Sequence, residues 1–424
     1  MLFDPERHEP LAAARWDEAS VRAWVERLAI DALRAFSPKD WWPIHPRDAD
    51  DDEPTQPSTT LYGGAAGMIW ALDNLARRGA AEQTLDFVPM MSELAARNSA
   101  IVETWGHGVE GLLMGRTGIL LLHYRMLDDG AERDAIADAI AVSVAANAAH
   151  PSLELLWGSP STMHVALTMH ERTGDARWAR LFLADAAALW RAFLPVDQGR
   201  FRTWTQDMYG RRTTYLGAGH GFAGNASALI RGRALLPKDT WTQWSEEIVR
   251  TTLATMLHEG PPANGPLANG SLAAGSLAAG SLANWPPQTT PERTPDKRLV
   301  QWCHGAPGIV TSLAGLRDPR LDDPLVAAGE LTWVAGPLSK GAGLCHGTAG
   351  NGHAFLKLFK RTGDELWLDR ARAFAMHALA QSDRMATEHG QRRYSLWTGD
   401  PGVACYLWSC IEGDDALPHF DPST

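Results

Sequence analysis

The sequence predicts an all-α protein, an α/α toroid of seven helical hairpins whose inner and outer helices form a double ring. A short turn signature recurs seven times along the 424-residue chain: a small residue, two variable residues and a second small residue. Each copy leads into an apolar run, and charged amphipathic segments separate the copies, while strand patterns are weak throughout. Units that cannot bury their own apolar faces stack on their neighbours, and seven of them can close into a ring.

The turn signature is the strongest of these observations. Seven copies at similar spacing are more than chance would produce, even in a chain with 39 glycines. The two small residues of the successive copies are Gly64 and Gly67, Gly115 and Gly118, Gly158 and Ser161, Gly221 and Gly224, Gly305 and Gly308, Gly347 and Gly350, and Gly399 and Gly402.

The runs that follow the turns are poor in charge, as expected of helices buried on most sides. We assign these runs to inner helices: Met68–Ala76, Ile119–Met126, Met163–Glu171, Ala226–Ile230, Ile309–Leu316 and His353–Phe359. Segments with an apolar face and a charged face are assigned to outer helices: Val21–Phe36, Trp178–Leu194, Trp241–Leu257 and Trp367–Ala380. Asp175 and Asp364 are expected to cap two of the outer helices.

The ring arrangement brings the starts of all inner helices together. Every inner helix begins at the same end of the ring, which we call the turn face because it carries the seven glycine turns. Side chains just before the turns therefore converge there, close to the positive ends of seven helix dipoles.

The repeats assign residues 1–424 to a single domain, although the length alone suggests two or three. Two stretches interrupt the rhythm. Residues 48–53 form an acidic run, and residues 260–295 form a Gly/Pro/Ala/Ser-rich, low-complexity loop insertion. Both are expected to project on the turn face, as solvated loops in the preferred interpretation or as a lid in the alternative.

Composition excludes several classes of protein. The net charge is −11, so a nucleic-acid binder with a basic face is not expected. The first residues do not resemble a signal peptide, and no uncharged apolar run reaches the roughly 18 residues of a membrane span. Four cysteines in a chain of this length favour a reducing compartment over a disulfide scaffold. We therefore expect a cytoplasmic protein.

Metal-ligating side chains cluster just before three consecutive turns. Cys303 and His304 precede the fifth turn, Cys345 and His346 the sixth, and His220 the fourth. Thiolate and imidazole ligands suit zinc, and catalytic zinc keeps one of four positions open. The residue pattern alone leaves two interpretations equally open: a Cys2His zinc site, or buried cysteines beside helix-capping histidines.

Other polar residues near the turns have a structural interpretation. Cys405 and Cys410 lie in an apolar run and are expected in the core. Glu110 and Glu154 precede the second and third turns. Each could be a carboxylate of the lumen or a partner of the helix turn, and we prefer the second.

The turns around residues 217–224, 302–308 and 343–350 resemble those of the lanthionine synthetase C-like (LanC-like) family, and the resemblance extends through all seven turns. It implies the double ring of helices. It also implies that Cys303, Cys345 and His346 are zinc ligands and that His220 is an acid/base beside the metal.

Three further residues bear on the branch of the family. His304 follows the first zinc cysteine, where peptide cyclases commonly carry tyrosine, and this form resembles the eukaryotic-type branch. Lys340 matches a lysine associated with glutathione-dependent activity in that branch. We therefore include His304 and Lys340 with His220 as candidate catalytic residues. Arg7 is only a loose counterpart of an N-terminal arginine of the branch.

The resemblance implies an enzyme. With zinc as cofactor, a thiol from glutathione or from a peptide cysteine adds to dehydroalanine or dehydrobutyrine in a peptide or protein and forms a thioether. One alternative is a lanthipeptide cyclase acting on a precursor peptide. Another is a non-catalytic, zinc-stabilised scaffold that binds glutathione or a protein. An α/α-barrel glycosidase or terpene-type cyclase ranks last, because such enzymes need acidic residues where this chain has cysteine and histidine.

Overall fold

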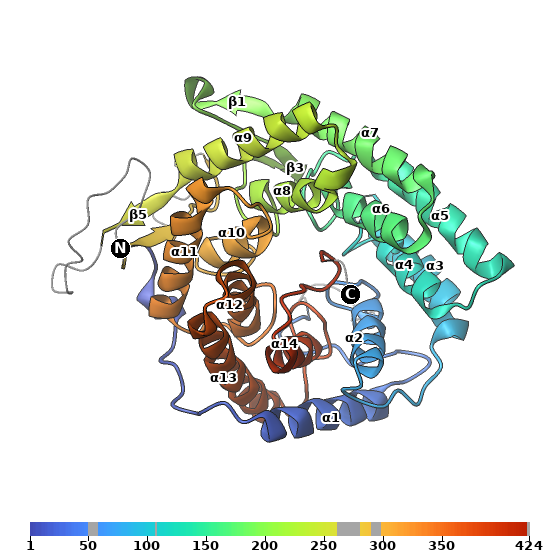
Figure 1. Cartoon of the computed structure of the whole chain (residues 1–424). Helices are drawn as coiled ribbons and strands as arrows, with labels where there is room; N and C mark the ends of the chain where they lie inside the picture. Colours follow the sequence, from blue (N-terminus) through green and yellow to red (C-terminus); the bar gives the residue numbers. More distant parts are fainter. Residues whose placement is uncertain (50–57, 107, 261–279, 290–297, 422–424) are drawn as a thin grey trace.

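The structure, a computed structural model, describes residues 1–49, 58–106, 108–260, 280–289 and 298–421. It confirms the toroid: seven helices surround the axis and seven others lie outside them (Figure 1). The inner helices are α2 (Ala65–Arg77), α4 (Arg116–Met126), α6 (Ser159–Thr173), α8 (Phe222–Arg231), α10 (Ala306–Leu313), α12 (Thr348–Thr362) and α14 (Asp400–Glu412). The outer helices are α1 (Glu18–Ala35), α3 (Met91–Thr104), α5 (Ala131–Asn147), α7 (Ala176–Ala192), α9 (Lys238–Thr255), α11 (Asp322–Ala335) and α13 (Glu365–His389).

Backbone hydrogen bonds between successive turns close the ring. Tyr62 N donates to Leu113 O, and bonds of the same kind link each turn to the next around the molecule. The circuit ends where Trp397 N donates to Tyr62 O at 2.9 Å. The complete set of donors is Tyr62, Met114, Leu155, Gly219, Cys303, Cys345 and Trp397. This circuit fixes the residues before the turns relative to one another and makes the turn face a rigid platform.

The inner helices begin earlier than the apolar runs suggested. Each starts directly after the first small residue of its turn, so the first glycine is the N-cap and the second lies in the first helical turn. The reason is that the backbone N–H groups of this first turn bond to carbonyls of the preceding loop, as Thr348 N does to Gly341 O at 3.0 Å. The outer-helix caps are as expected, since Asp175 and Asp364 accept from Arg177 N and Leu366 N.

Close backbone approach explains the second glycine of each turn. A Cβ at Gly350 would lie 1.7 Å from Leu344 O, and one at Gly308 would lie 1.9 Å from Trp302 O. The third turn has Ser161 at this place and uses it differently, because Ser161 Oγ accepts from Leu112 N of the neighbouring repeat. Glycine is therefore required where the chain doubles back most tightly.

We expect Gly350→Ala to destabilise the toroid by about 3 kcal/mol or more, because the new methyl overlaps a backbone carbonyl that the ring holds in place. Chemical denaturation would measure the loss. Gly63→Ala is the matched control, since a Cβ there meets only the Thr60 hydroxyl, at 3.9 Å. Equal stabilities of the two variants would contradict the explanation.

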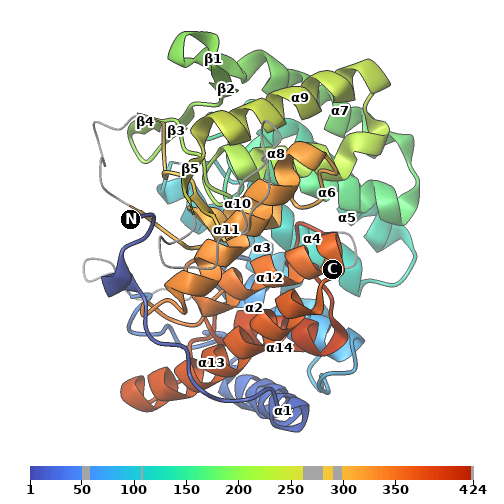
Figure 2. The same cartoon turned by 60° about the vertical axis from the view of Figure 1, so that its left-hand side comes forward.

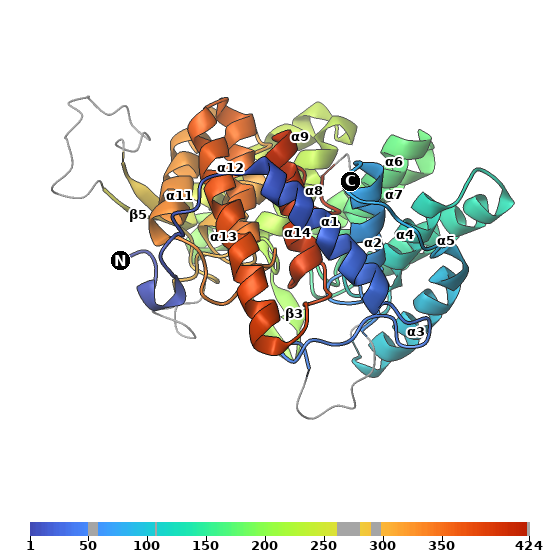
Figure 3. The same ribbon diagram turned by 90° about the horizontal axis from the view of Figure 1, so that it is seen from below.

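Three short antiparallel ribbons interrupt the helices, which the weak strand patterns did not predict. β1 (Leu194–Val196) pairs with β2 (Phe201–Thr203), β3 (Gln206–Met208) with β4 (Arg211–Thr213), and β5 (Leu257–Glu259) with β6 (Leu282–Asn284). The first two ribbons lie between α7 and α8. Seen from below, β3 lies in the lower part of the view, beneath the level of the C-terminus (Figure 3).

The two predicted loop stretches fall mostly outside the described residues. Of the 260–295 insertion, the described part contains β6, whose Asn284 is buried and accepts from Ala306 N at the start of α10. Of the acidic run 48–53, Asp48 forms an ion pair with Arg393.

The N-terminal segment crosses the outside of the late repeats (Figure 2). Glu9 N donates to Pro337 O, and the Glu9 carboxylate bonds to His377 of α13 at 2.6 Å. Through this crossing the short helix Pro5–Arg7 comes close to the fifth turn. None of the helices in the described part of the chain is long and apolar enough to span a membrane.

Candidate metal centre

Two thiols and one imidazole meet on the turn face. The ligand atoms of Cys303, Cys345 and His346 all lie within 4.8 Å of one another. Both cysteines stand two residues before their turns, and Cys303 N donates to Cys345 O at 3.1 Å. The cysteines are buried and His346 is half-buried, so the group opens on one side. Of the two interpretations of these cysteines, this geometry favours the metal site.

These donors fit a zinc ion. Tetrahedral zinc with bonds of about 2.0–2.3 Å keeps its ligand atoms roughly 3.3–3.8 Å apart. A group spread over 4.8 Å or less is compatible with that spacing. Two cysteine sulfurs and one histidine nitrogen are ligands that zinc prefers, and three protein ligands leave a fourth position for an exchangeable group.

Hydrogen bonds hold the two sulfurs in place. Gln301 Nε2 donates to Cys303 Sγ at 2.9 Å. The pKa of the Cys303 thiol lies well below its usual value, chiefly because Cys345 hydrogen-bonds to it and also because of His346. The pKa of the Cys345 thiol is raised, first by its bond to Cys303 and then by burial. Cys303 is therefore the sulfur that ionises first.

Tyr62 makes a contact that the sequence analysis did not predict. Its hydroxyl hydrogen-bonds with the Cys345 thiol, and burial together with that thiol raises the pKa of Tyr62. Its ring stacks on Trp397 with centroids 6.4 Å apart. Tyr62 stands two residues before the first turn, the same place that Cys303 and Cys345 occupy in theirs, and that equivalence is a signal that could have identified it.

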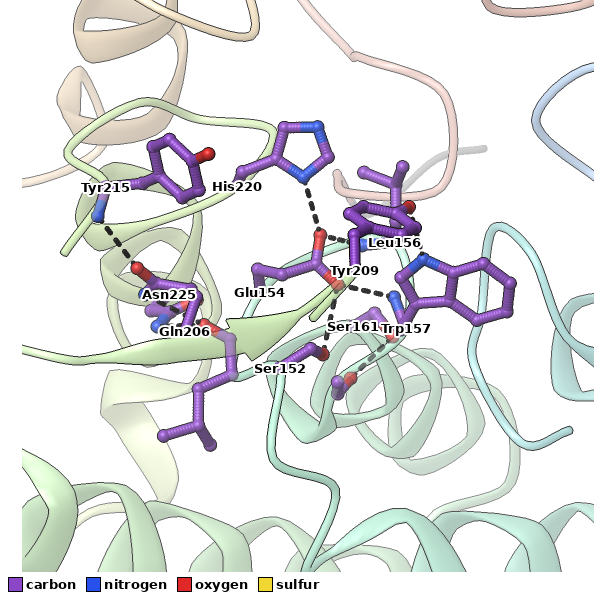
Figure 4. A network of polar contacts seen from close by, with 12 residues as sticks. Ser152, Glu154, Leu156, Trp157, Ser161, Gln206, Tyr209, Tyr215, His220 and Asn225 are labelled. Carbon is purple, nitrogen blue, oxygen red and sulfur yellow. Dashed lines mark hydrogen bonds and ion pairs between the residues drawn. The ribbon is translucent and has the colours of Figure 1, made fainter. Parts of the chain in front are cut away.

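His220 lies beside the metal group and is paired with a buried carboxylate (Figure 4). Its Nδ1 donates to Glu154 Oε2 at 3.1 Å. Burial alone would lower the pKa of His220, but the hydrogen bond and charge of Glu154 outweigh it and raise that pKa. The His220 side chain keeps 22% of its surface exposed, whereas that of Glu154 is fully buried. The raised pKa favours the protonated imidazole, whose other nitrogen, Nε2, faces away from Glu154.

Glu154 fills both of the roles that the sequence left open, as a partner of the helix turn and as a carboxylate of the lumen. It accepts from Leu156 N at 2.9 Å and from Trp157 N at 2.7 Å, which makes it a partner of the turn backbone. It also reaches His220 in the lumen. Glu110 is a partner of the helix turn, because its carboxylate accepts from the guanidinium of Arg116 at the start of α4.

Aromatic side chains enclose the imidazoles. His304 lies 5.8 Å from His220 and 5.4 Å from Tyr215, measured between ring centroids. Tyr215 is positioned by Gln206 of β3, whose Oε1 accepts from Tyr215 N at 2.8 Å. At the tip of the same ribbon, the Tyr209 hydroxyl accepts from Trp157 Nε1 at 2.8 Å (Figure 4). The β3–β4 ribbon thus forms one wall of the centre.

Two cationic side chains lie near the sulfurs. Burial lowers the pKa of Lys340, and the charges of Cys303 and Cys345 oppose that shift, so the ammonium lies within electrostatic reach of the sulfurs. Arg7 Nη2 donates to Gln301 Oε1 at 3.5 Å, so the N-terminal segment brings a second cation to the same place. The sequence offered Arg7 only as a loose candidate, because nothing local indicates this long-range crossing.

The structure thus brings Cys303, Cys345, His346, His220, His304 and Lys340 to one end of the toroid. Cys405 and Cys410 lie apart from them in α14, and both are buried with free thiols, as expected.

Comparison with known proteins identifies the family. The model of the lanthionine synthetase C-like protein family matches residues 48–421. LanC-like protein GCL1 of Arabidopsis thaliana is 37% identical over 125 residues, and the glutathione S-transferase LANCL1 of Danio rerio is 40% identical over 124 residues. These alignments span 28% and 29% of the two relatives, less than a third of either.

The solved structure of nisin cyclase resembles the toroid as a whole. It superposes with a TM-score of 0.52 over 84% of this chain and 94% of that one, at 14% sequence identity. This similarity concerns the fold. The family match over residues 48–421 shows that the chain belongs to the lanthionine synthetase C-like family.

Proposed function

We propose that the protein is a zinc-dependent enzyme that adds a thiol to dehydroalanine or dehydrobutyrine and forms a thioether, with glutathione as the thiol donor. The observation that carries the proposal is the convergence of Cys303, Cys345 and His346 beside an imidazole that is hydrogen-bonded to a buried carboxylate. The Danio rerio relative, named a glutathione S-transferase, supports the choice of thiol.

Zinc bound by Cys303, Cys345 and His346 would supply a Lewis acid that stabilises a thiolate at neutral pH. Lys340 and Arg7 would orient the donor, because their charges suit the two carboxylates of glutathione. Gln301 keeps the Cys303 sulfur in place during binding.

The remaining residues handle protons. The sulfur of the donor bonds to Cβ, and the π electrons of the alkene move to Cα and the adjacent carbonyl. His220, through Nε2, gives its proton to Cα, while Glu154 compensates the charge of the imidazole. His304 takes the proton that the thiol loses. Exchange with solvent then removes this proton from His304 and restores the one that His220 gave. The addition consumes no net proton, and no oxidant is needed.

The test is to incubate the purified chain with glutathione and a peptide that contains dehydroalanine, and to follow the mass of the peptide. We expect a glutathione adduct whose formation stops after zinc is removed with a chelator and returns when zinc is added. Zinc content near zero in the purified protein would contradict the proposal. Glutathione binding without adduct formation would indicate the scaffold instead.

The same assay separates the cyclase alternative. A peptide that contains both cysteine and dehydroalanine would lose its free thiol without a change of mass if the chain catalysed ring closure. A dehydratase and a short Ser/Thr/Cys-rich precursor peptide encoded beside this chain would also favour cyclisation.

A further inference from the structure

A cavity of about 680 Å³ lies on the turn face between the first, second and last repeats. Its walls come from the loop after α1, from the end of α3 and from the first and second turns. The side chains that give it an apolar surface are Trp42, Ile44, Ile101, Trp105 and Met114. Trp105 keeps 37% of its surface exposed, which is unusual for so large an apolar side chain.

The cavity adjoins the metal centre through one residue. Tyr62 lines it, and the hydroxyl of Tyr62 hydrogen-bonds with the Cys345 thiol. Thr398, next to the Trp397 on which Tyr62 stacks, lines it as well. A molecule bound here would therefore end beside the sulfurs of the candidate site.

The described residues that line the cavity carry no unpaired charge. Among its described lining residues, the carboxylate of Asp48 is paired with Arg393. Burial and the nearby His389 lower the pKa of His45 to about 4, so His45 is uncharged. Lys340 and Arg7, the cations near the sulfurs, do not line the cavity.

The cavity and the cationic side chains near the sulfurs differ in chemistry. Lys340 and Arg7 suit an anionic thiol donor. The cavity beside Tyr62 is apolar, is rimmed by hydroxyl groups of threonine and serine, and suits an uncharged segment. An electrophile held in the cavity and a nucleophile held by Lys340 and Arg7 would not compete for one place.

We propose that the cavity beside Tyr62 binds the peptide segment that flanks the dehydroamino acid and that it selects apolar, uncharged neighbours. This inference rests on the proposed function for the identity of the electrophile. The walls are built from fixed groups: the indole of Trp42 donates to Ala32 O at 2.7 Å, and Trp105 packs edge-on against Trp157. The cavity is thus pre-formed for a side chain rather than created by it.

Ala100→Trp tests the inference. Ala100 is exposed on α3 and lines the cavity, so an indole there would occupy the space without disturbing the core. Ala96→Trp is the matched control, because Ala96 is exposed on the same helix but lines a different hollow, together with Leu120 and Val142. The probes are two fluorescent peptides in which dehydroalanine is flanked by leucine or by aspartate.

Binding of these probes is measured without any thiol, so that the result does not depend on turnover. The wild type should bind the leucine peptide about 10-fold more tightly than the aspartate peptide. Ala100→Trp should abolish that preference while keeping the zinc content and the affinity for glutathione, and Ala96→Trp should behave as the wild type. Trp105→Ala, which removes part of the wall, should also weaken binding of the leucine peptide.

The outcomes separate this inference from the proposed function. If the wild type does not prefer the leucine peptide, or if Ala100→Trp leaves the preference intact, the inference is wrong even when glutathione adducts form. If the preference and its loss are observed but no adduct ever forms, the binding site stands and the proposed reaction fails.

Discussion

A Cys345→Ala variant is expected to lose zinc and thioether formation together while the toroid stays folded. Cys345 supplies one of three ligand atoms, and its backbone bonds to the neighbouring turns do not involve the side chain. Mutation of a residue that only orients a metal ligand typically lowers metal affinity or activity by about 10- to 100-fold. Loss of a ligand itself should therefore lower turnover by more than about 100-fold. Metal analysis and the adduct assay on the same preparation would measure both.

Cys410→Ala is the matched control for this experiment. Cys410 is also a buried free thiol, but it lies in α14, where burial raises its pKa to about 12 and keeps it neutral. The variant should lose about 1 kcal/mol of stability and keep its zinc and its activity. If Cys345→Ala retained zinc, or if both variants lost it alike, the assignment of the ligands would be wrong.

The fold was predictable because its repeating feature is local. Six of the seven turns need glycine where a Cβ would meet a carbonyl six residues earlier in the chain, as at Gly350 and Leu344, and such a requirement leaves a mark in the sequence. The helix caps at Asp175 and Asp364 are local for the same reason. The short ribbons were missed because three-residue strands leave too little alternation to be recognised.

The candidate site was predictable only in part. Cys303, Cys345 and His346 stand at equivalent places before consecutive turns, so the ring geometry brings them together. Tyr62 and Arg7 reach the same place from the far end of the chain, through ring closure and through the N-terminal crossing. Neither of these long-range contacts has a local signal in the sequence. The second role of Glu154 likewise depends on the position of His220, one repeat away.

Replacing His220 with alanine is expected to lower turnover by about 10²- to 10⁴-fold and to leave the zinc content unchanged, because a general acid is lost but no ligand is.

A more specific result is expected for Glu154→Gln, which keeps an oxygen that can accept from Leu156 N and Trp157 N but removes the charge. The pKa of His220 is raised by Glu154 against the opposing effect of burial. Without that charge, burial lowers the pKa.

The direction of the pH effect follows from the role of His220. An acid acts in its protonated form, so the rate falls as the pH rises through its pKa. In Glu154→Gln this fall should begin at lower pH than in the wild type, and the pH profile of kcat would show it.

The other groups facing His220 are His304, Tyr215 and the Cys303 sulfur, and they are unchanged in the variant. Glu110→Gln, the equivalent change one repeat earlier, should leave the profile in place, because Glu110 contacts Arg116 and not His220. A profile that did not move in Glu154→Gln would show that the proton delivered to Cα does not come from His220.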